Sequence, residues 1–192
     1  MAGSRFPRRR LLLGLGGLIL IALAIALPVF KPWLLFVNTR VDDKIPQVAA
    51  AGQAPATGEP AGSATGSPAA GAEGPELVAR GTFISHEHTT TGEASIVRGS
   101  DGSHQLVLSN LETSNGPDVR VWLSAGPVVE GAAGWTTAGD HEHLEVAPLK
   151  GNRGNQVYDL PADFDPAAWP SVDLWCEDFS VSFGAAALSP AG

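Results

Sequence analysis

Residues 171–183 read SVDLWCEDFSVSF, and apolar and polar side chains alternate along them. Val172, Leu174 and Cys176 occupy every second position, the pattern of an extended strand with one face against a core. Beyond Cys176 the alternation moves by one position, because the next apolar residue of the pattern is Phe179. This shift predicts a bulge or sharp bend directly after the cysteine, with a plain sheet corner as the alternative.

The same period of two recurs upstream to residue 76, and turn residues separate the alternating runs. Eight short strands are predicted, at Leu77–Ile84, Glu93–Arg98, His104–Ser109, Val119–Ser124, Leu144–Lys150, Gln156–Leu160, Val172–Cys176 and Phe179–Phe183. No window of helical length after Pro75 keeps an apolar period of 3.6 residues. We therefore expect residues 76–189 to form one all-β domain, a single sandwich or barrel-like fold of about eight strands.

The N-terminal part has a different character. The twenty residues Leu11–Phe30 carry no charge and are long enough to cross the hydrocarbon layer as a helix. Arg8, Arg9 and Arg10 precede them, so the positive-inside rule places residues 1–10 in the cytoplasm as a basic tail. We expect residues 11–37 to be a single transmembrane anchor with its interfacial flank, and the C-terminal domain to lie outside the cytoplasm.

Two alternatives concern export. Ala24-Ile25-Ala26 has the small-x-small form read by signal peptidase, so the apolar run could instead be a cleaved signal peptide. A retained anchor is favoured, because the run continues through Phe30 and resumes at Trp33. The arginine triplet also fits a twin-arginine export signal, although ordinary flanking charge is the favoured interpretation.

Residues 38–75 are predicted to be a flexible linker. Between Ala49 and Pro75, twenty-four of twenty-seven residues are Ala, Gly, Pro, Ser or Thr. Such a composition has little to bury and cannot offset the entropy lost on ordering. We expect a disordered tether.

Charge and cysteine content narrow the partners and the compartment. Residues 1–37 hold five basic and no acidic groups, whereas the rest of the chain holds seven basic and all twenty acidic groups. An acidic domain repels phosphate backbones, so we expect no nucleic-acid partner. Cys176 is the only cysteine, which excludes an intramolecular disulfide. The absence of an Asn-x-Ser/Thr sequon suits a bacterial envelope protein.

No catalytic motif for hydrolysis, phosphate binding or covalent haem attachment is present, and no enzymatic activity is indicated. Two histidine pairs, His86/His88 and His141/His143, would each place both rings on one face of an extended segment. Zinc sites usually close with cysteine or with carboxylates at rigid spacing, which these pairs lack. We therefore expect solvated surface histidines and no metal ligands.

Several blocks of sequence resemble a known family. They are HTTTGEASI at 88–96, SNGPD at 114–118, LKGNRGNQVY at 149–158 and SVDLWCEDFSVSFG at 171–184. In this order and spacing they resemble the DM-thirteen domain, also called the electron transfer DM domain, over nearly all of residues 76–188. Two features depart from its pattern: Val146-Ala147-Pro148 replaces an expected Leu-Gly pair, and His-Glu-His at 141–143 is an addition.

The resemblance implies a redox role centred on the family's cysteine, which falls on Cys176, while the family's early histidine falls on His88. Trp175, beside the cysteine, joins them as a candidate cofactor-binding residue; the cofactor itself is not identified. We expect a membrane-tethered redox or electron-transfer accessory domain that serves a membrane redox partner protein. Arg120 and His88 are candidates to activate the thiol. The alternative is a non-catalytic envelope module that binds a ligand or protein through its strand-end loops.

Overall fold

The computed structural model describes residues 6–30, 37–48 and 74–191. The N-terminal elements are the helix α1 (Phe6–Phe30) and the strand β1 (Arg40–Asp42). The other strands are β2 (Glu76–Ser85), β3 (Thr91–Arg98), β4 (His104–Glu112), β5 (Val119–Ser124), β6 (His143–Pro148), β7 (Arg153–Asp159), β8 (Ser171–Cys176), β9 (Val181–Ala187) and β10 (Ser189–Pro190). The described residues also include the short 3-10 helices η2 (Gly131–Trp135), η3 (Thr137–Asp140) and η4 (Pro166–Ala168).

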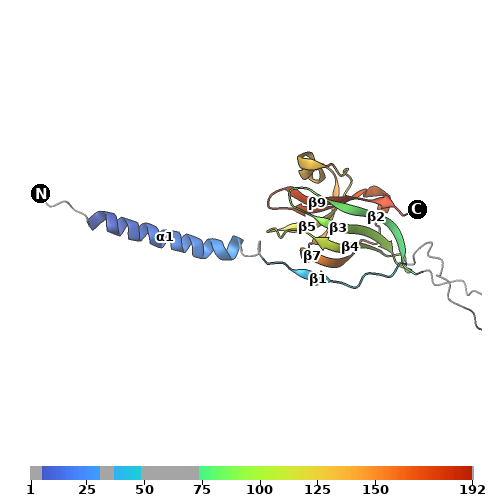
Figure 1. Ribbon diagram of the computed structural model, residues 1–192, viewed down its shortest axis with the longest axis horizontal. Helices are drawn as coiled ribbons and strands as arrows, with labels where there is room; N and C mark the ends of the chain where they lie inside the picture. Colours follow the sequence, from blue (N-terminus) through green and yellow to red (C-terminus); the bar gives the residue numbers. More distant parts are fainter. Residues whose placement is uncertain (1–5, 31–36, 49–73, 192) are drawn as a thin grey trace, which may run out of the picture.

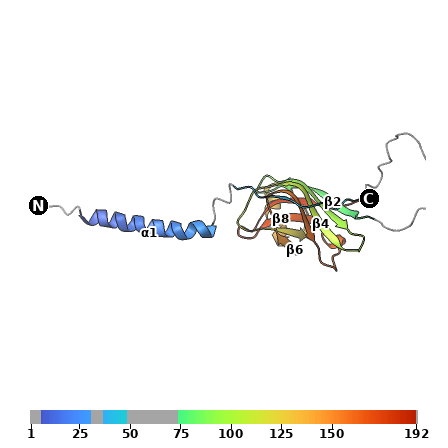
Figure 2. The same ribbon diagram turned by 90° about the horizontal axis from the view of Figure 1, so that it is seen from below.

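The ten strands form a single sheet (Figures 1 and 2). Along the sheet the order is β1-β7-β4-β3-β2-β9-β8-β5-β6, and β10 pairs with β2. All pairs are antiparallel except β1 with β7, which is parallel. The sheet curls into a half-barrel, and this closes apolar side chains inside it. The prediction of a mostly β, barrel-like domain is thus confirmed, with the barrel present as a half-barrel sheet.

All eight strands predicted from the alternation are present as β2 to β9, with ends that differ by a few residues. One addition comes from the predicted linker. Residues 38–48 lie along the outer edge of the sheet, where β1 pairs with β7. Their composition carries no strand pattern, so only a non-local partner orders them. The rest of the predicted linker, residues 49–73, lies outside the described residues.

At the N-terminus, the predicted apolar helix is present as α1. Its described side chains, from Leu12 to Leu27, are largely exposed in the isolated chain. Within the described parts of the chain, no helix is both long enough and apolar enough to span a membrane. The predicted flank at residues 31–36, including Trp33, and residues 1–5 of the predicted tail lie outside the described residues.

The sheet carries a core on each face near β5 and β8. Val121, Leu123, Leu174 and Cys176 join the large cluster inside the half-barrel. The residues between them, including Trp122, point to the opposite face, because neighbours on a strand point to opposite sides. There Trp122, Trp175 and Ala138 form a second small cluster. Ala138 belongs to η3, and the η2–η3 segment lies outside the sheet (Figure 1).

The chain does bend sharply after Cys176, but by a hairpin turn and not by a bulge within one strand. Residues 177–180 form the turn, and Cys176 pairs with Val181 across it. Phe179, predicted to begin the next strand, lies in the turn and is 69% exposed. The register irregularity of this strand pair lies earlier, between Asp173 and Trp175.

A glycine substitution tests the close approach of β2 and β9. A Cβ atom at Gly81 would lie 2.1 Å from the carbonyl oxygen of Ala187, which is backbone and cannot turn away. We expect Gly81→Ala to lower the free energy of unfolding by roughly 1–3 kcal/mol, as overpacking does. Urea denaturation measures the change. The control is Gly74→Ala, where a Cβ meets no atom within 4 Å; equal stability of both variants would contradict the packing.

Candidate functional site

Cys176, the predicted redox residue, ends β8 on the inner face of the sheet. Its cross-strand neighbours are Val119 on β5 and Val181 on β9. The side chain is fully buried, at 0% exposure, and belongs to the main core cluster. Its thiol is free, and no described group forms a hydrogen bond with it. Reagents in solution therefore cannot reach the sulfur without local opening of the domain.

Trp175, the predicted neighbour, points to the opposite face. Its ring stacks on Trp122, with ring centroids 4.8 Å apart and planes inclined by 18°. On its other side Trp122 stacks on the exposed His143, at 3.6 Å and 7°. Gly139 of η3 lies flat against Trp175, since a Cβ at this position would come within 2.7 Å of the indole. Three aromatic rings thus run from the surface to the residue that adjoins the cysteine.

His88 lies in the loop after β2. It is not a member of the aromatic stack, and it does not bond to Cys176. Its ring packs on Phe183, with centroids 3.9 Å apart, and its Nε2 lies 2.6 Å from a carboxylate oxygen of Glu87. Phe183 belongs to the same core cluster as Cys176. His88 therefore lies at the edge of the core cluster that contains Cys176. No hydrogen bond among the described residues joins His88 to Cys176.

Arg120, a predicted candidate for activating the thiol, lies on the outer face and is paired with carboxylates. It is the cross-strand partner of Trp175 and so shares the outer face with that ring. Its guanidinium binds the carboxylates of Asp118 at 2.6 Å and Glu145 at 2.7 Å.

The alternation alone did not reveal a buried polar chain beneath η2. His86 Nδ1 lies 2.7 Å from Ser182 Oγ, and Ser182 Oγ lies 2.8 Å from Asp173 Oδ2. The other ring nitrogen of His86 lies 3.0 Å from the carbonyl oxygen of Val129. His86, Ser182 and Asp173 are each at least nine-tenths buried. The expectation of a solvated histidine is wrong for His86, because the 125–135 segment covers it.

One proton shared along this chain satisfies both of its bonds. The Val129 oxygen can only accept, so His86 Nε2 must carry hydrogen and donate. If His86 is doubly protonated, Nδ1 donates to Ser182 and the serine donates to an ionised Asp173. If His86 is neutral, a protonated Asp173 donates to Ser182 and the serine donates to Nδ1. Both arrangements have zero net charge and leave both bonds satisfied.

Burial favours the neutral arrangement. Desolvation raises the pKa of the Asp173 carboxyl to about 7, partly offset by the hydrogen bond from Ser182. Desolvation also lowers the pKa of His86, against the opposing effect of its bond to Val129. Both directions disfavour charged forms in this part of the sheet. The proton therefore lies mainly on Asp173.

Two polar atoms beside the aromatic rings have no partner in the described structure. They are the indole nitrogen of Trp122 and Oδ1 of Asp173. One can only donate and the other can accept, and the two residues are cross-strand partners on β5 and β8. The site therefore places an aromatic pair next to a carboxyl oxygen that can accept a further hydrogen bond.

The histidine pairs do not form a ligand cage. In the described residues, no group of three or more His, Cys, Asp or Glu side chains is arranged to hold a metal ion. His141 is exposed, and its Nδ1 donates to the carbonyl oxygen of Thr137 at 2.8 Å. The His143 ring stacks on Trp122.

Comparison with known proteins gives one match. Residues 82–188 match the family model described as Electron transfer DM13. No curated protein and no solved structure matches the chain significantly.

The buried proton chain predicts how stability depends on pH. The pKa of Asp173 rises from 3.8 to about 7 on folding, so its contribution is complete below about pH 4 and is lost as the pH rises through about 7. His86, whose pKa falls on folding, contributes in the opposite sense: its share is lost as the pH falls below about 6.5. The rise in the pKa of Asp173 from 3.8 to about 7 corresponds to a contribution of at most about 4 kcal/mol to the free energy of unfolding.

We therefore expect the wild-type free energy of unfolding to fall between about pH 5 and pH 8 by less than the Asp173 contribution alone, because the gain from His86 up to about pH 6.5 opposes it. Asp173→Asn keeps the shape and removes the Asp173 titration, so its free energy of unfolding should no longer fall over this interval. Denaturant titrations at several pH values measure it. The exposed Asp163→Asn is the matched control and should behave as wild type. An unchanged fall in Asp173→Asn would show that another group is responsible.

Proposed function

Because the chain belongs to the electron transfer DM13 family, we propose that it is a redox accessory domain whose electron-accepting or electron-donating group is Cys176. The observation that supports this best is the aromatic stack. His143, Trp122 and Trp175 form a continuous series of rings that starts at the surface and ends at the residue covalently next to the cysteine.

The burial of Cys176 shapes the chemistry. A fully buried thiol is shielded from disulfide exchange, which requires direct attack by another thiolate. Electron transfer does not need contact with the sulfur, only closely packed groups that lead to it. In this proposal an oxidised partner meets the domain near the exposed His143 and accepts one electron from Cys176 through the two indoles. The thiol is oxidised to a thiyl radical and releases its proton to solvent on local opening, and the reverse step restores the thiol.

A membrane attachment is the second part of the proposal. It is supported by the sequence: the charge-free run Leu11–Phe30 extends beyond the described side chains of α1 at both ends, and an arginine cluster precedes it. In this proposal the domain lies outside the cytoplasm of a bacterial cell and works with a membrane redox protein. Residues 49–73 would give it lateral reach.

A substitution at the cysteine tests the redox centre. Cys176→Ser replaces the thiol by a hydroxyl in an apolar site, so we expect a loss of roughly 1–3 kcal/mol in stability. In the folded full chain, a one-electron photo-oxidant should generate a sulfur-centred radical, detected by electron paramagnetic resonance of freeze-quenched samples, because this measurement needs no reagent in contact with the buried sulfur. The variant should lose this signal and keep the indole radical.

The control for this experiment is Val172→Thr. Val172 is fully buried on the same face of the same strand, so the variant introduces a hydroxyl into the same core. It should lose similar stability and retain the sulfur signal. If wild type shows no sulfur signal while folded, the cysteine is a packing residue, and the ligand- or protein-binding module becomes the better interpretation.

A reporter fusion tests the membrane topology. An export-dependent reporter placed after Gly192 should be active and should remain in the membrane fraction, since Arg8–Arg10 hold the N-terminus inside. Replacing the three arginines with glutamate should reduce reporter activity. A soluble product that begins at Leu27 would show that the apolar run is a cleaved signal.

A further inference from the structure

The segment from Asn38 to Asp43, called here the strap, lies along the free edge of β7. Arg40, Val41 and Asp42 are the Cα partners of Arg153, Gly154 and Asn155 in a parallel pairing. The backbone bonds at the two ends run from Arg153 N to Thr39 O at 3.2 Å and from Asp43 N to Asn155 O at 2.9 Å.

One buried side chain recognises the start of the strap. Asn152 is 2% exposed, and its Oδ1 accepts a hydrogen bond from the Thr39 amide at 2.8 Å. Its Nδ2 donates to Asn38 Oδ1 at 2.8 Å and to the carbonyl oxygen of Thr113 at 2.9 Å. Both the oxygen and the nitrogen of the Asn152 side-chain amide thus bind the strap, and the nitrogen also binds the body of the domain at Thr113.

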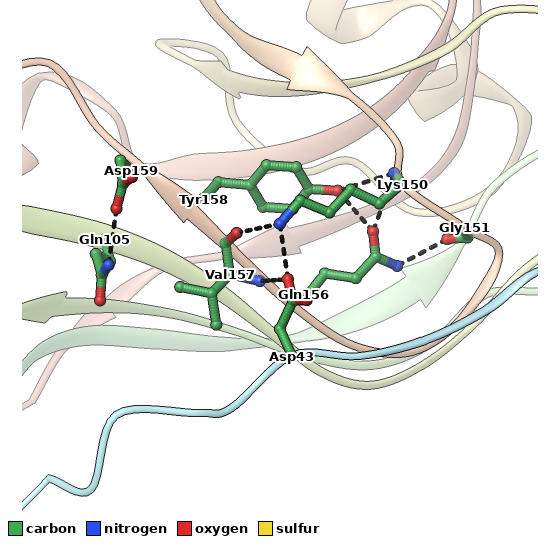
Figure 3. A network of polar contacts seen from close by, with 8 residues as sticks. All are labelled: Asp43, Gln105, Lys150, Gly151, Gln156, Val157, Tyr158 and Asp159. Atoms are coloured by element: carbon green, nitrogen blue, oxygen red, sulfur yellow. Dashed lines mark hydrogen bonds and ion pairs between the residues drawn. The ribbon is translucent and has the colours of Figure 1, made fainter.

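A charged contact recognises the end of the strap (Figure 3). The Asp43 carboxylate accepts hydrogen bonds from Lys150 Nζ at 2.7 Å and from the Val157 amide at 3.0 Å. Lys150 is held in place by its own contacts: Nζ donates to the Val157 carbonyl at 2.6 Å and lies 4.8 Å from the centre of the Tyr158 ring. The lysine lowers the pKa of Asp43, so the carboxylate is ionised at neutral pH.

The edge of β7 is shaped to receive a backbone. A Cβ at Gly151 would lie 2.5 Å from the Thr39 carbonyl oxygen. At Gly154, where φ is +100°, it would lie 2.0 Å from the Val41 carbonyl oxygen. Neither close approach is open to another residue without movement of the strap.

The receiving residues coincide with a block of the family sequence. Lys150, Gly151, Asn152, Gly154 and Tyr158 all belong to LKGNRGNQVY, whereas the strap lies outside the matched range 82–188. The receiving edge is therefore part of the family domain and its occupant is not.

The strap is held by polar contacts and little apolar burial. In β1 only Val41 is half-buried, and Arg40 and Asp42 are exposed. Net hydrogen-bond energies of about 1 kcal/mol each make such a complex weak as a bimolecular pair. Covalent connection through residues 49–73 supplies an effective concentration on the order of millimolar, which keeps the edge occupied.

We infer that the edge of β7 is a binding site for an extended peptide with a carboxylate five residues after a polar side chain, and that the strap is its exchangeable intramolecular occupant. The site works by strand addition: the backbone bonds supply affinity, and Asn152 and Lys150 supply specificity. This inference does not depend on the redox proposal.

The test exchanges the occupant in the folded chain. A protease site is inserted within residues 49–73, the full-length protein is folded in detergent, and the linker is then cut. A synthetic peptide of residues 37–48 is added in excess, and amide hydrogen exchange is followed at Arg153 and Val157, whose amides the strap binds. We expect both amides to lose protection on dilution after cleavage and to regain it with the peptide.

Peptide variants keep the domain unchanged, so misfolding cannot imitate a result. The peptide with Asp43→Asn should bind roughly tenfold or more weakly, because it lacks the charge-assisted bonds to Lys150. The peptide with Asp42→Asn is the matched control and should bind as wild type, since among the described residues the Asp42 carboxylate pairs only with Arg40 of the strap itself.

Three results would overturn the inference. The first is protection at Arg153 and Val157 that survives both dilution and excess peptide, which would make the strap a permanent strand. The second is equal binding of the two variant peptides. The third is protection in the uncut chain that falls on dilution, which would assign the occupant to a second copy.

Discussion

All six residues of β8 are buried, and the rest of the domain depends on how both faces of this strand are covered. The inner face carries Leu174 and Cys176 into the main core. The outer face carries Ser171 and Asp173, which need hydrogen-bond partners once water is excluded. Ser171 Oγ donates to the carbonyl oxygen of Gly126 at 2.8 Å, and Asp173 is bonded to Ser182. The bond from Ser171 thus fastens the loop at Gly126, which leads to η2, over a polar strand face.

The alternation of apolar residues was enough to predict the strands, because each of β2 to β9 has at least one face in the core. It could not show that the polar face of β8 is buried as well. Ser182 and Asp173 occupy positions that alternation assigns to solvent, and their covering segment comes from residues 125–142, distant in sequence. His86 was misread for the same reason. A polar residue in a strand is exposed only if nothing folds over it.

The site residues show a similar limit. Cys176 and Trp175 are neighbours in sequence, which predicted a joint site, yet a strand sends them to opposite faces. The sequence blocks shared with the family also divide by role. The block around Cys176 forms a two-sided core strand, whereas the block at 149–158 forms an edge that receives another strand. Motif similarity identified both blocks and could not distinguish these roles, because β1 lies outside the family range.

The position of β1 in the chain has a mechanical consequence. On its N-terminal side residues 31–39 separate β1 from α1, and on its other side residues 43–75 lead to β2. A pull between α1 and the domain therefore acts first on the β1–β7 pairing, because β1 is paired with the sheet and precedes residues 49–73 in the chain. A modest force would detach β1, and the chain between β1 and β2 would then extend before the force reached β2. The edge strand β1 would thus be the first element to yield under tension. When β1 detaches, the ten-stranded sheet loses only its outermost strand.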